Sequence, residues 1–159
     1  MTDDARFEDG GERPLRLKAL DADDVPVLAA LVQDAVFPIT EMKWDRSRRR
    51  FAILLNRFRW EDKPAAETRQ RDFERVQSVL AIEDVTRVSS QGIDRNDKEI
   101  VLSLLTLSFQ PGEDGTGRIE MTLAGDGAIA IEVEALEVTL RDVTRPYVAP
   151  SGKVPGHPE

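Results

Sequence analysis

Residues 118–134 read RIEMTLAGDGAIAIEVE, and this stretch decides the fold class. Apolar side chains alternate with polar ones from Ile119 onward and again, beyond the central glycines, up to Val133. Alternation with a period of two predicts half-buried β-strands. Gly125 and Asp126 tolerate the positive φ angles of a tight hairpin turn. The stretch therefore predicts an antiparallel β-hairpin.

The same alternation continues over much of the chain and predicts a large sheet. Further strands are expected over residues 15–19, 37–44 with a slip near Glu41, 49–60, 74–82, 85–90 and 100–109. The ranges 74–82 and 85–90 could also form one broken strand. The strand at 49–60 is apolar on both faces, which is typical of a central strand covered by a helix on one side and the core on the other. Residues 136–143 fit either a strand or a helical stripe. Their β-branched pair Val138-Thr139 favours a strand.

One amphipathic helix is expected over residues 22–35. Its apolar side chains recur with the helical period of 3.6 residues, at Val25, Leu28, Val32 and Ala35. Asp21 can cap the free N–H groups at the start, with Asp24 three residues later completing a capping box. Residues 61–72 are polar and predict a loop or a short surface helix.

These elements define an α+β domain with a mostly antiparallel sheet and an N-terminal amphipathic helix. A partly closed, PH-like β-barrel is an alternative form of that sheet. Composition predicts a disordered lead over residues 1–14, a single domain over 15–143 and a Pro-rich disordered tail over 144–159, in which Tyr147-Val148 is a candidate docking turn.

Composition excludes several classes of enzyme. The chain of 159 residues has no Cys, and its one histidine, His157, lies among prolines near the end. Thiol, Ser–His–acid and HExxH chemistry are therefore excluded. The sequence has no phosphate-binding glycine motif, so we expect no cofactor. It has neither a signal-peptide pattern nor a long apolar run, so we expect a cytoplasmic protein that does not bind membranes.

The charge is unevenly distributed along the chain. The net charge is −8, yet residues 46–59 carry six arginines and no acid, whereas residues 112–143 carry eight acids and two arginines. This contrast predicts an anion-binding patch. Its candidate residues are Arg46, Arg48, Arg49 and Arg50, with Arg57, Arg59 and Arg95 as outliers. The alternative is ordinary surface, with these arginines paired to acids on neighbouring strands.

Three other groups of polar residues are weaker candidates for a site. Asn56 interrupts an apolar strand and must find hydrogen-bond partners, from a ligand or from the fold. The loop at 92–97 has acids that suggest a cation site, although an Asp94 side chain bonded to its own backbone is the simpler interpretation. A row of carboxylates occupies the polar, solvent-facing positions of strands with alternating sequence, where acidic residues are common because they keep a protein soluble. These residues are Glu120, Glu132, Glu134, Glu137 and Asp142.

Several spaced blocks give the chain a family resemblance. They are LKALDADD at 17–24, LVQDA at 31–35, EMKW at 41–44, RRFA at 49–52, NRFRWE at 56–61, GIDR at 92–95, VLSLL at 101–105 and AGDG at 124–127. Together they resemble a family of small alphaproteobacterial proteins known only as a domain of unknown function. The resemblance covers residues 15–143. It implies a single domain in the bacterial cytoplasm and brings no activity, cofactor or catalytic residue with it.

The leading functional hypothesis is a non-catalytic binding domain whose arginine patch contacts an acidic protein. Self-association, with the basic region against the acidic segment 112–143, is a special case. Nucleic-acid binding through the same patch is the first alternative, and an enzyme acting on a small anionic metabolite is the second.

Overall fold

A computed structural model describes residues 14–70 and 72–148. Within them the chain forms one eleven-stranded sheet in which every pairing is antiparallel. The strands are β1 (Arg16–Ala19), β2 (Val36–Pro38), β3 (Met42–Asp45), β4 (Arg50–Phe58), β5 (Glu74–Ile82), β6 (Val85–Gln91), β7 (Val101–Pro111), β8 (Gly117–Leu123), β9 (Ala128–Val133), β10 (Val138–Asp142) and β11 (Tyr147–Val148). The α+β class with a mostly antiparallel sheet is confirmed.

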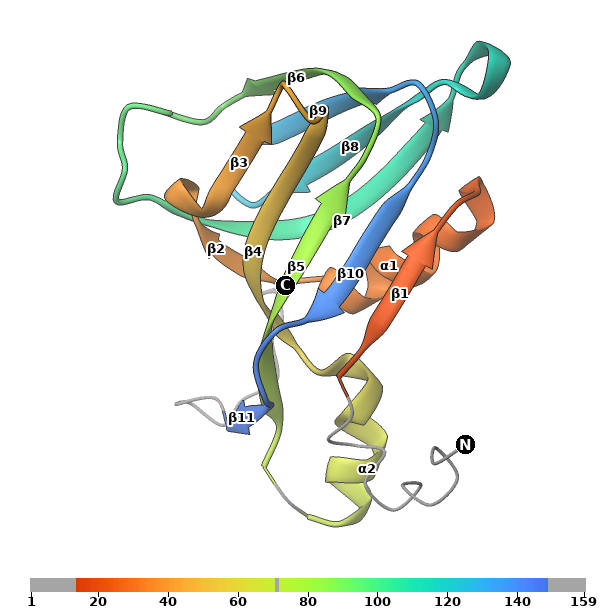
Figure 1. Ribbon diagram of the computed structural model, residues 1–159. Helices are drawn as coiled ribbons and strands as arrows, with labels where there is room; N and C mark the ends of the chain where they lie inside the picture. Colours follow the sequence, from red (N-terminus) through yellow and green to blue (C-terminus); the bar gives the residue numbers. More distant parts are fainter. Residues whose placement is uncertain (1–13, 71, 149–159) are drawn as a thin grey trace.

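The sheet has two halves joined by β2. The strand order is β1-β10-β5-β4-β2-β7-β8-β9-β6; β3 pairs with β4 on the same side as β2, and β11 pairs with β5. Val36 of β2 pairs with Asn56 of β4 and with Ser103 of β7, so this short strand holds the halves together. The halves curve toward each other in Figure 1. The buried side chains of both halves belong to one hydrophobic core.

The sheet does not close, so the barrel alternative is wrong. β1 and β6 stand at the two ends of the strand order and do not pair with each other, and β3 and β6 do not pair either, since β3 pairs with β4 and β6 with β9. One backbone hydrogen bond of 2.9 Å, from Val85 N–H to the Arg49 carbonyl, ties the start of β6 to the turn before β4. Beyond it a β-bulge between Val85 and Arg87 interrupts the register of β6. A bulge bends its strand locally and disrupts the regular pairing.

The hairpin predicted at residues 118–134 is confirmed as β8 and β9. Ile119 lies opposite Ile131 and Met121 opposite Ile129, so one face of the hairpin is entirely apolar. Both Gly125 and Asp126 have positive φ angles, as the turn requires. This apolar face forms much of the core that the second half of the sheet contributes.

The predicted helix is present but ends earlier than its apolar period suggests. A 3-10 turn, η2 (Ala22–Asp24), leads into α1 (Val25–Val32), and the predicted capping box joins Asp21 and Asp24. Val25, Leu28 and Val32 are buried in the core. The helix stops because Gln33 leaves the helical region and Asp34 has a φ of 63°.

β4 is central, as predicted, but no helix of the described residues covers its second face. Phe51, Ile53 and Leu55 are buried in the same core as α1. Ala52 and Leu54, on the opposite face, are half-exposed. The helix and the core therefore lie on one side of this strand, and the other side is an outer surface.

Most remaining expectations for the secondary structure are confirmed. Residues 74–82 and 85–91 form two strands, and 138–142 is a strand rather than a helix. The polar segment at 61–72 contains the end of η4 (Trp60–Asp62) and the short helix α2 (Lys63–Thr68), which lies beyond the end of the sheet in Figure 1. The predicted slip near Glu41 is a 3-10 turn, η3 (Ile39–Glu41), which separates β2 from β3.

The predictions for the ends of the chain fall mostly outside the described residues. Residues 1–13 and 149–159, including His157, lie there. Tyr147 and Val148 pair with β5 as β11, which agrees with the docking turn expected at this position. No helix within 14–70 and 72–148 is long and apolar enough to cross a membrane.

Candidate functional site

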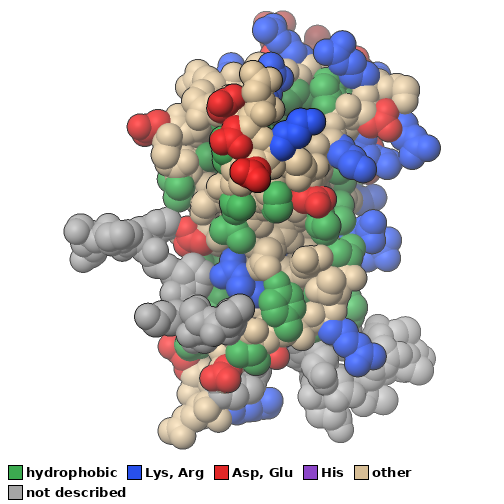
Figure 2. All heavy atoms as spheres, turned by 90° about the vertical axis from the view of Figure 1, so that its left-hand side faces the viewer, with side chains coloured by type: hydrophobic (Ala, Val, Ile, Leu, Met, Phe, Trp, Pro, Cys, Tyr) green, Lys and Arg blue, Asp and Glu red, His purple; other side chains and the backbone are tan. Residues whose placement is uncertain are grey.

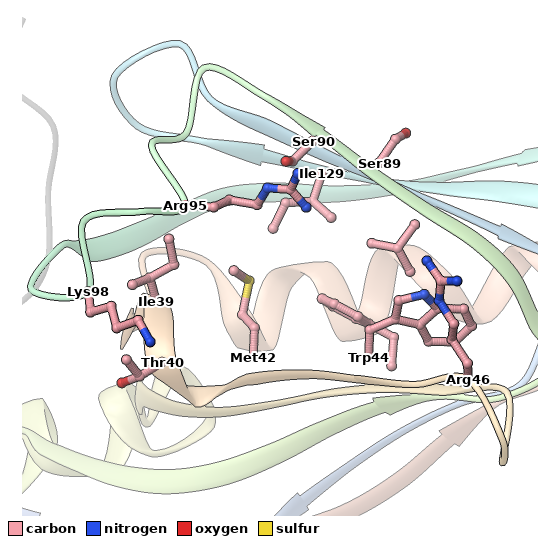
Figure 3. Close-up of a pocket in the computed structure, with 12 residues that line it drawn as sticks. Ile39, Thr40, Met42, Trp44, Arg46, Ser89, Ser90, Arg95, Lys98 and Ile129 are labelled. Carbon is pink, nitrogen blue, oxygen red and sulfur yellow. The ribbon is translucent and has the colours of Figure 1, made fainter.

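A groove of about 460 Å³ lies where the sheet fails to close. In Figure 3, β6 lies along one side and β3 along the other. A volume of this order is typical of ligand-binding clefts. We call this feature the β3–β6 groove.

The floor of the β3–β6 groove is apolar because apolar side chains that face inward line the gap between the strands. Met42 lies opposite Ile53 in the register of β3 and β4, and Trp44 lies opposite Phe51. Directly opposed residues project from the same face of a sheet. Met42 and Trp44 therefore point with the core residues into the gap (Figure 3), and Val88 of β6 also lines the groove.

The margin of the groove is basic. Arg46, Arg95 and Lys98 line it, and we call them the rim cations. In Figure 3, Arg46 and Lys98 stand at opposite ends, and Arg95 extends along the β6 side. Among the described residues none of the three forms an ion pair, and no acidic residue lines the groove. Figure 2 faces this side of the molecule and shows hydrophobic atoms exposed among Lys and Arg side chains, with Asp and Glu side chains nearby.

The segment 92–100 places Arg95 and Lys98 at the groove. The Asp94 carboxylate accepts the backbone N–H of Asn96 at 3.0 Å, and the Asp97 carboxylate accepts that of Glu99 at 3.1 Å. The Ile100 carbonyl accepts the N–H of Ile39 at 2.9 Å, which fixes the end of the segment beside η3. The acids of this loop thus serve its turns, as the backbone interpretation of Asp94 predicted.

The other arginines of the predicted turn are surface residues with acidic partners. Arg48 lies 3.8 Å from Asp45, Arg49 lies 2.7 Å from Glu134 and Arg50 lies 2.9 Å from Glu83. The Ser47 hydroxyl donates a 2.8 Å hydrogen bond to Asp45. This hydrogen bond lowers the pKa of the exposed Asp45 carboxyl, and a hydrogen bond from the Arg48 backbone N–H adds a smaller effect in the same direction.

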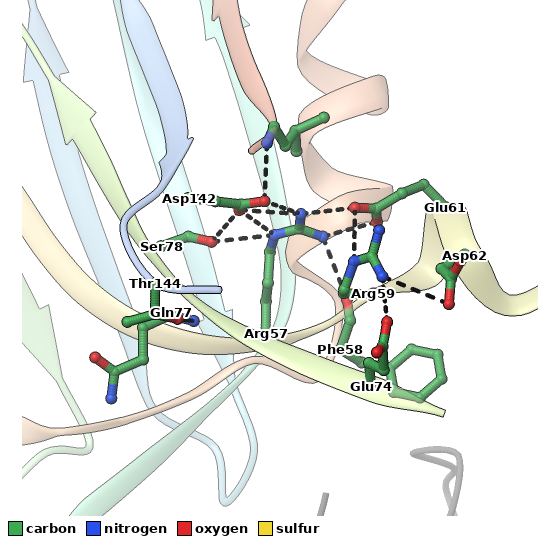
Figure 4. A network of polar contacts seen from close by, with 11 residues as sticks. Arg57, Phe58, Arg59, Glu61, Asp62, Glu74, Gln77, Ser78, Asp142 and Thr144 are labelled. Carbon is green, nitrogen blue, oxygen red and sulfur yellow. Dashed lines mark hydrogen bonds and ion pairs between the residues drawn. The ribbon is translucent and has the colours of Figure 1, made fainter. Parts of the chain in front are cut away.

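Arg57 is fully buried at the far end of β4, so it is not part of a surface patch. Its guanidinium lies 3.1 Å from Asp142 and 2.8 Å from Glu61, and its Nε donates to the Ser78 hydroxyl at 3.1 Å (Figure 4). Burial by itself lowers the pKa of Arg57, but the hydrogen bonds and charges of Glu61 and Asp142 outweigh that effect and raise it. The Asp142 carboxylate also accepts the N–H of Leu15 at 2.9 Å. This network joins the start of the domain to β4, β5 and β10.

Arg59 continues the same buried network. Its side chain is 4% exposed, forms an ion pair with Glu74 and lies 3.5 Å from Asp62 (Figure 4). The structure therefore does not bring the seven predicted arginines together. Arg46 and Arg95 line the groove, Arg48, Arg49 and Arg50 are paired at the turn, and Arg57 and Arg59 hold the fold.

Asn56 finds its partners within the fold. Its Nδ2 donates to the Tyr147 hydroxyl, and its Oδ1 accepts a 2.6 Å hydrogen bond from Arg75 Nε. Partial burial lowers the pKa of Arg75, and Tyr147 and Asp34 oppose this effect. The amide thus helps to hold β11 against the sheet.

The predicted row of carboxylates is dispersed. Glu134 pairs with Arg49, Glu137 lies 3.8 Å from Lys18 and Glu120 lies 3.7 Å from Arg118. Asp142 is buried with Arg57. Within residues 14–70 and 72–148, no group of three or more His, Cys, Asp or Glu side chains could hold a metal ion.

Sequence reasoning missed most residues of the groove, including Met42, Trp44 and Lys98. The alternation of β3 predicts Met42 and Trp44 as core residues, and Lys98 follows a loop in which only Arg95 and the acids are candidates. The one available signal was that two further cations, Arg95 and Lys98, lie in the segment 92–100, although three acids accompany them there. Nothing in the sequence places that segment beside β3.

Comparison with known proteins identifies the family but no function. A family model described as "Protein of unknown function (DUF2948)" matches residues 15–157. No curated protein and no solved structure matches the chain significantly. The family match covers most of the chain and confirms the resemblance to a domain of unknown function. The chain is therefore a member of the DUF2948 family.

Proposed function

We propose that this protein is a non-catalytic binding domain that takes an acidic segment of a partner protein into the β3–β6 groove. One observation carries the proposal: an apolar floor is bordered by three rim cations that have no acidic partner among the described residues. Clefts that bind ligands combine apolar walls with a few placed polar groups in this way. We expect the partner to be another cytoplasmic protein.

The charge distribution supports an acidic partner at this place. The protein carries a net charge of −8, so an acidic molecule is repelled by most of its surface. Arg46, Arg95 and Lys98 give the groove a local charge of the opposite sign. A carboxylate that reaches them breaks no existing ion pair, whereas one that reaches Arg49 must displace Glu134. Complementary charge of this kind fixes where a partner binds.

The proposal is tested by selection of binders from a random octapeptide library displayed on phage, with the full chain as bait. We expect the selected peptides to be acidic. Their affinity should fall by about tenfold or more in the Arg46→Glu/Arg95→Glu/Lys98→Glu variant, since reversal of rim charges turns attraction into repulsion. Fluorescence polarisation of labelled peptides measures this change.

A matched variant at the neighbouring arginines separates the groove from general basicity. Arg48→Glu/Arg49→Glu/Arg50→Glu changes the net charge equally but removes arginines that are already paired. We expect it to weaken peptide binding by no more than about threefold. Equal losses in the two variants, or selected peptides that are not acidic, would overturn the proposal. A labelled single-stranded DNA that binds more tightly than the peptides, with a steep salt dependence, would favour the nucleic-acid alternative instead.

A further inference from the structure

We propose that the partner segment binds as an added β-strand on the free edge of β6, with acidic and apolar residues alternating along it. This inference rests on the proposed function and specifies how the groove is occupied. The unpaired strand edges that border the groove support this inference, in addition to the charges of the rim cations.

Two strand edges face the groove without a partner strand. β3 pairs on one side with β4, and β6 pairs on one side with β9. Within 14–70 and 72–148, no strand pairs with their other sides. An unpaired edge presents a row of backbone N–H and C=O groups that can template another strand. The space between these edges is the β3–β6 groove, as Figure 3 shows.

β6 offers the better edge of the two. From Arg87 to Gln91 it keeps a regular register with β9, which gives five consecutive residues of undistorted strand. Ser89 and Ser90 are exposed and carry small side chains, so the backbone between them is accessible. β3 has only four residues and follows directly on the 3-10 turn η3. A segment of about five residues is therefore sufficient to pair with β6.

The two sides of such a strand meet different surroundings. Successive side chains of a strand point to opposite faces. Those that point inward from a strand beside β6 meet Met42, Trp44 and Val88 on the apolar floor. Those that point outward remain in solvent, within reach of the rim cations that border the groove. The site therefore selects a segment in which apolar and acidic residues alternate.

An N-methylation scan of a selected octapeptide tests the strand. Methylation of an amide removes its hydrogen, and only alternate amides of an added strand face β6. We expect methylation to weaken binding by about tenfold or more at every second residue of the bound core. Methylation at the residues between them should change affinity by only about twofold. Fluorescence polarisation gives the affinities.

Hydrogen–deuterium exchange of the intact protein supplies a second readout. We expect peptide binding to slow exchange of backbone amides in β6, at 87–91. β1 is the internal control, because it lies at the other end of the sheet, pairs with β10 and is remote from the groove. Its exchange should not change.

The outcomes separate this inference from the proposed function. An acidic peptide that tolerates methylation at every residue, yet still loses affinity in the Arg46→Glu/Arg95→Glu/Lys98→Glu variant, overturns strand addition and leaves the proposed function standing. Protection of β3 without protection of β6 overturns the choice of edge. Peptides insensitive to the charge reversal overturn both.

Discussion

Replacement of Arg57 by methionine is expected to lower the free energy of unfolding by about 3–5 kcal/mol. The substitution leaves the side chain of Asp142, which is 4% exposed, without the counter-charge 3.1 Å away. Glu61 loses the same partner. A buried charge without a partner costs more than the ion pair itself contributes, because its desolvation is no longer offset. Urea denaturation of the two proteins measures the difference.

A methionine at Arg50 is the matched control. Arg50 lies on the same strand and pairs with Glu83 at 2.9 Å, but its side chain is 45% exposed. We expect Arg50→Met to cost no more than about 1 kcal/mol, since water replaces the lost partner. Asp142→Asn in the Arg57→Met background should recover part of the stability by removing the unpaired charge. Equal losses at Arg57 and Arg50 would contradict a structural role for the buried network.

The same network predicts a pH dependence through Glu61. Partial burial raises the pKa of this carboxyl, but the hydrogen bonds and charge of Arg57 outweigh that effect and lower it below its ordinary value of 4.5. A carboxyl whose folded pKa is lowered stabilises the fold above its unfolded pKa and loses that effect as pH falls through the folded value. The stability difference between wild type and Arg57→Met should therefore narrow below pH 4.5. A constant difference down to pH 3 would show that Glu61 is not coupled to Arg57.

The sequence predicts the strands well because their signals are local. Alternation of apolar residues specifies β8 and β9, and the glycines between them specify the turn. The start of α1 was predictable for the same reason, since the capping box spans only residues 21–24. The end of α1 was not, because Ala35 continues the apolar period although the backbone has already turned at Asp34.

The site was less predictable because it depends on how distant strands meet. Charge density along 46–59 predicted one patch, but β4 carries Arg57 into the interior beside Asp142, which lies 85 residues later in the chain. The rim cations come from two segments that only the fold brings together. The β3–β6 groove lies between two strands that are distant in the sequence and do not pair, and no local pattern in 85–91 signals that the sheet stays open.

Replacement of Gly92 by alanine is expected to cost about 3 kcal/mol of stability and to weaken binding at the groove. Gly92 follows β6 directly and has a φ of 69°, a conformation that costs other residues about 1–2 kcal/mol. A Cβ at this position would lie 2.7 Å from the Asp126 carbonyl oxygen, in the turn of the β8–β9 hairpin. Because that neighbour is backbone, either the turn or the start of segment 92–100 must move, at a further cost.

A shift of segment 92–100 matters for function because this segment carries two of the three rim cations, Arg95 and Lys98. Gly125→Ala is the matched control: Gly125 has a φ of 82° in the same hairpin turn, but a Cβ there meets nothing within 4 Å. We expect Gly125→Ala to lower the free energy of unfolding by only about 1–2 kcal/mol, the conformational cost of the positive φ, and to bind acidic peptides as the wild type does. Gly92→Ala should lose more stability and bind the peptides more weakly at temperatures where both variants are folded. Wild-type affinity in Gly92→Ala would mean that the positions of Arg95 and Lys98 do not determine recognition, and these two cations would then be surface charges without a binding role.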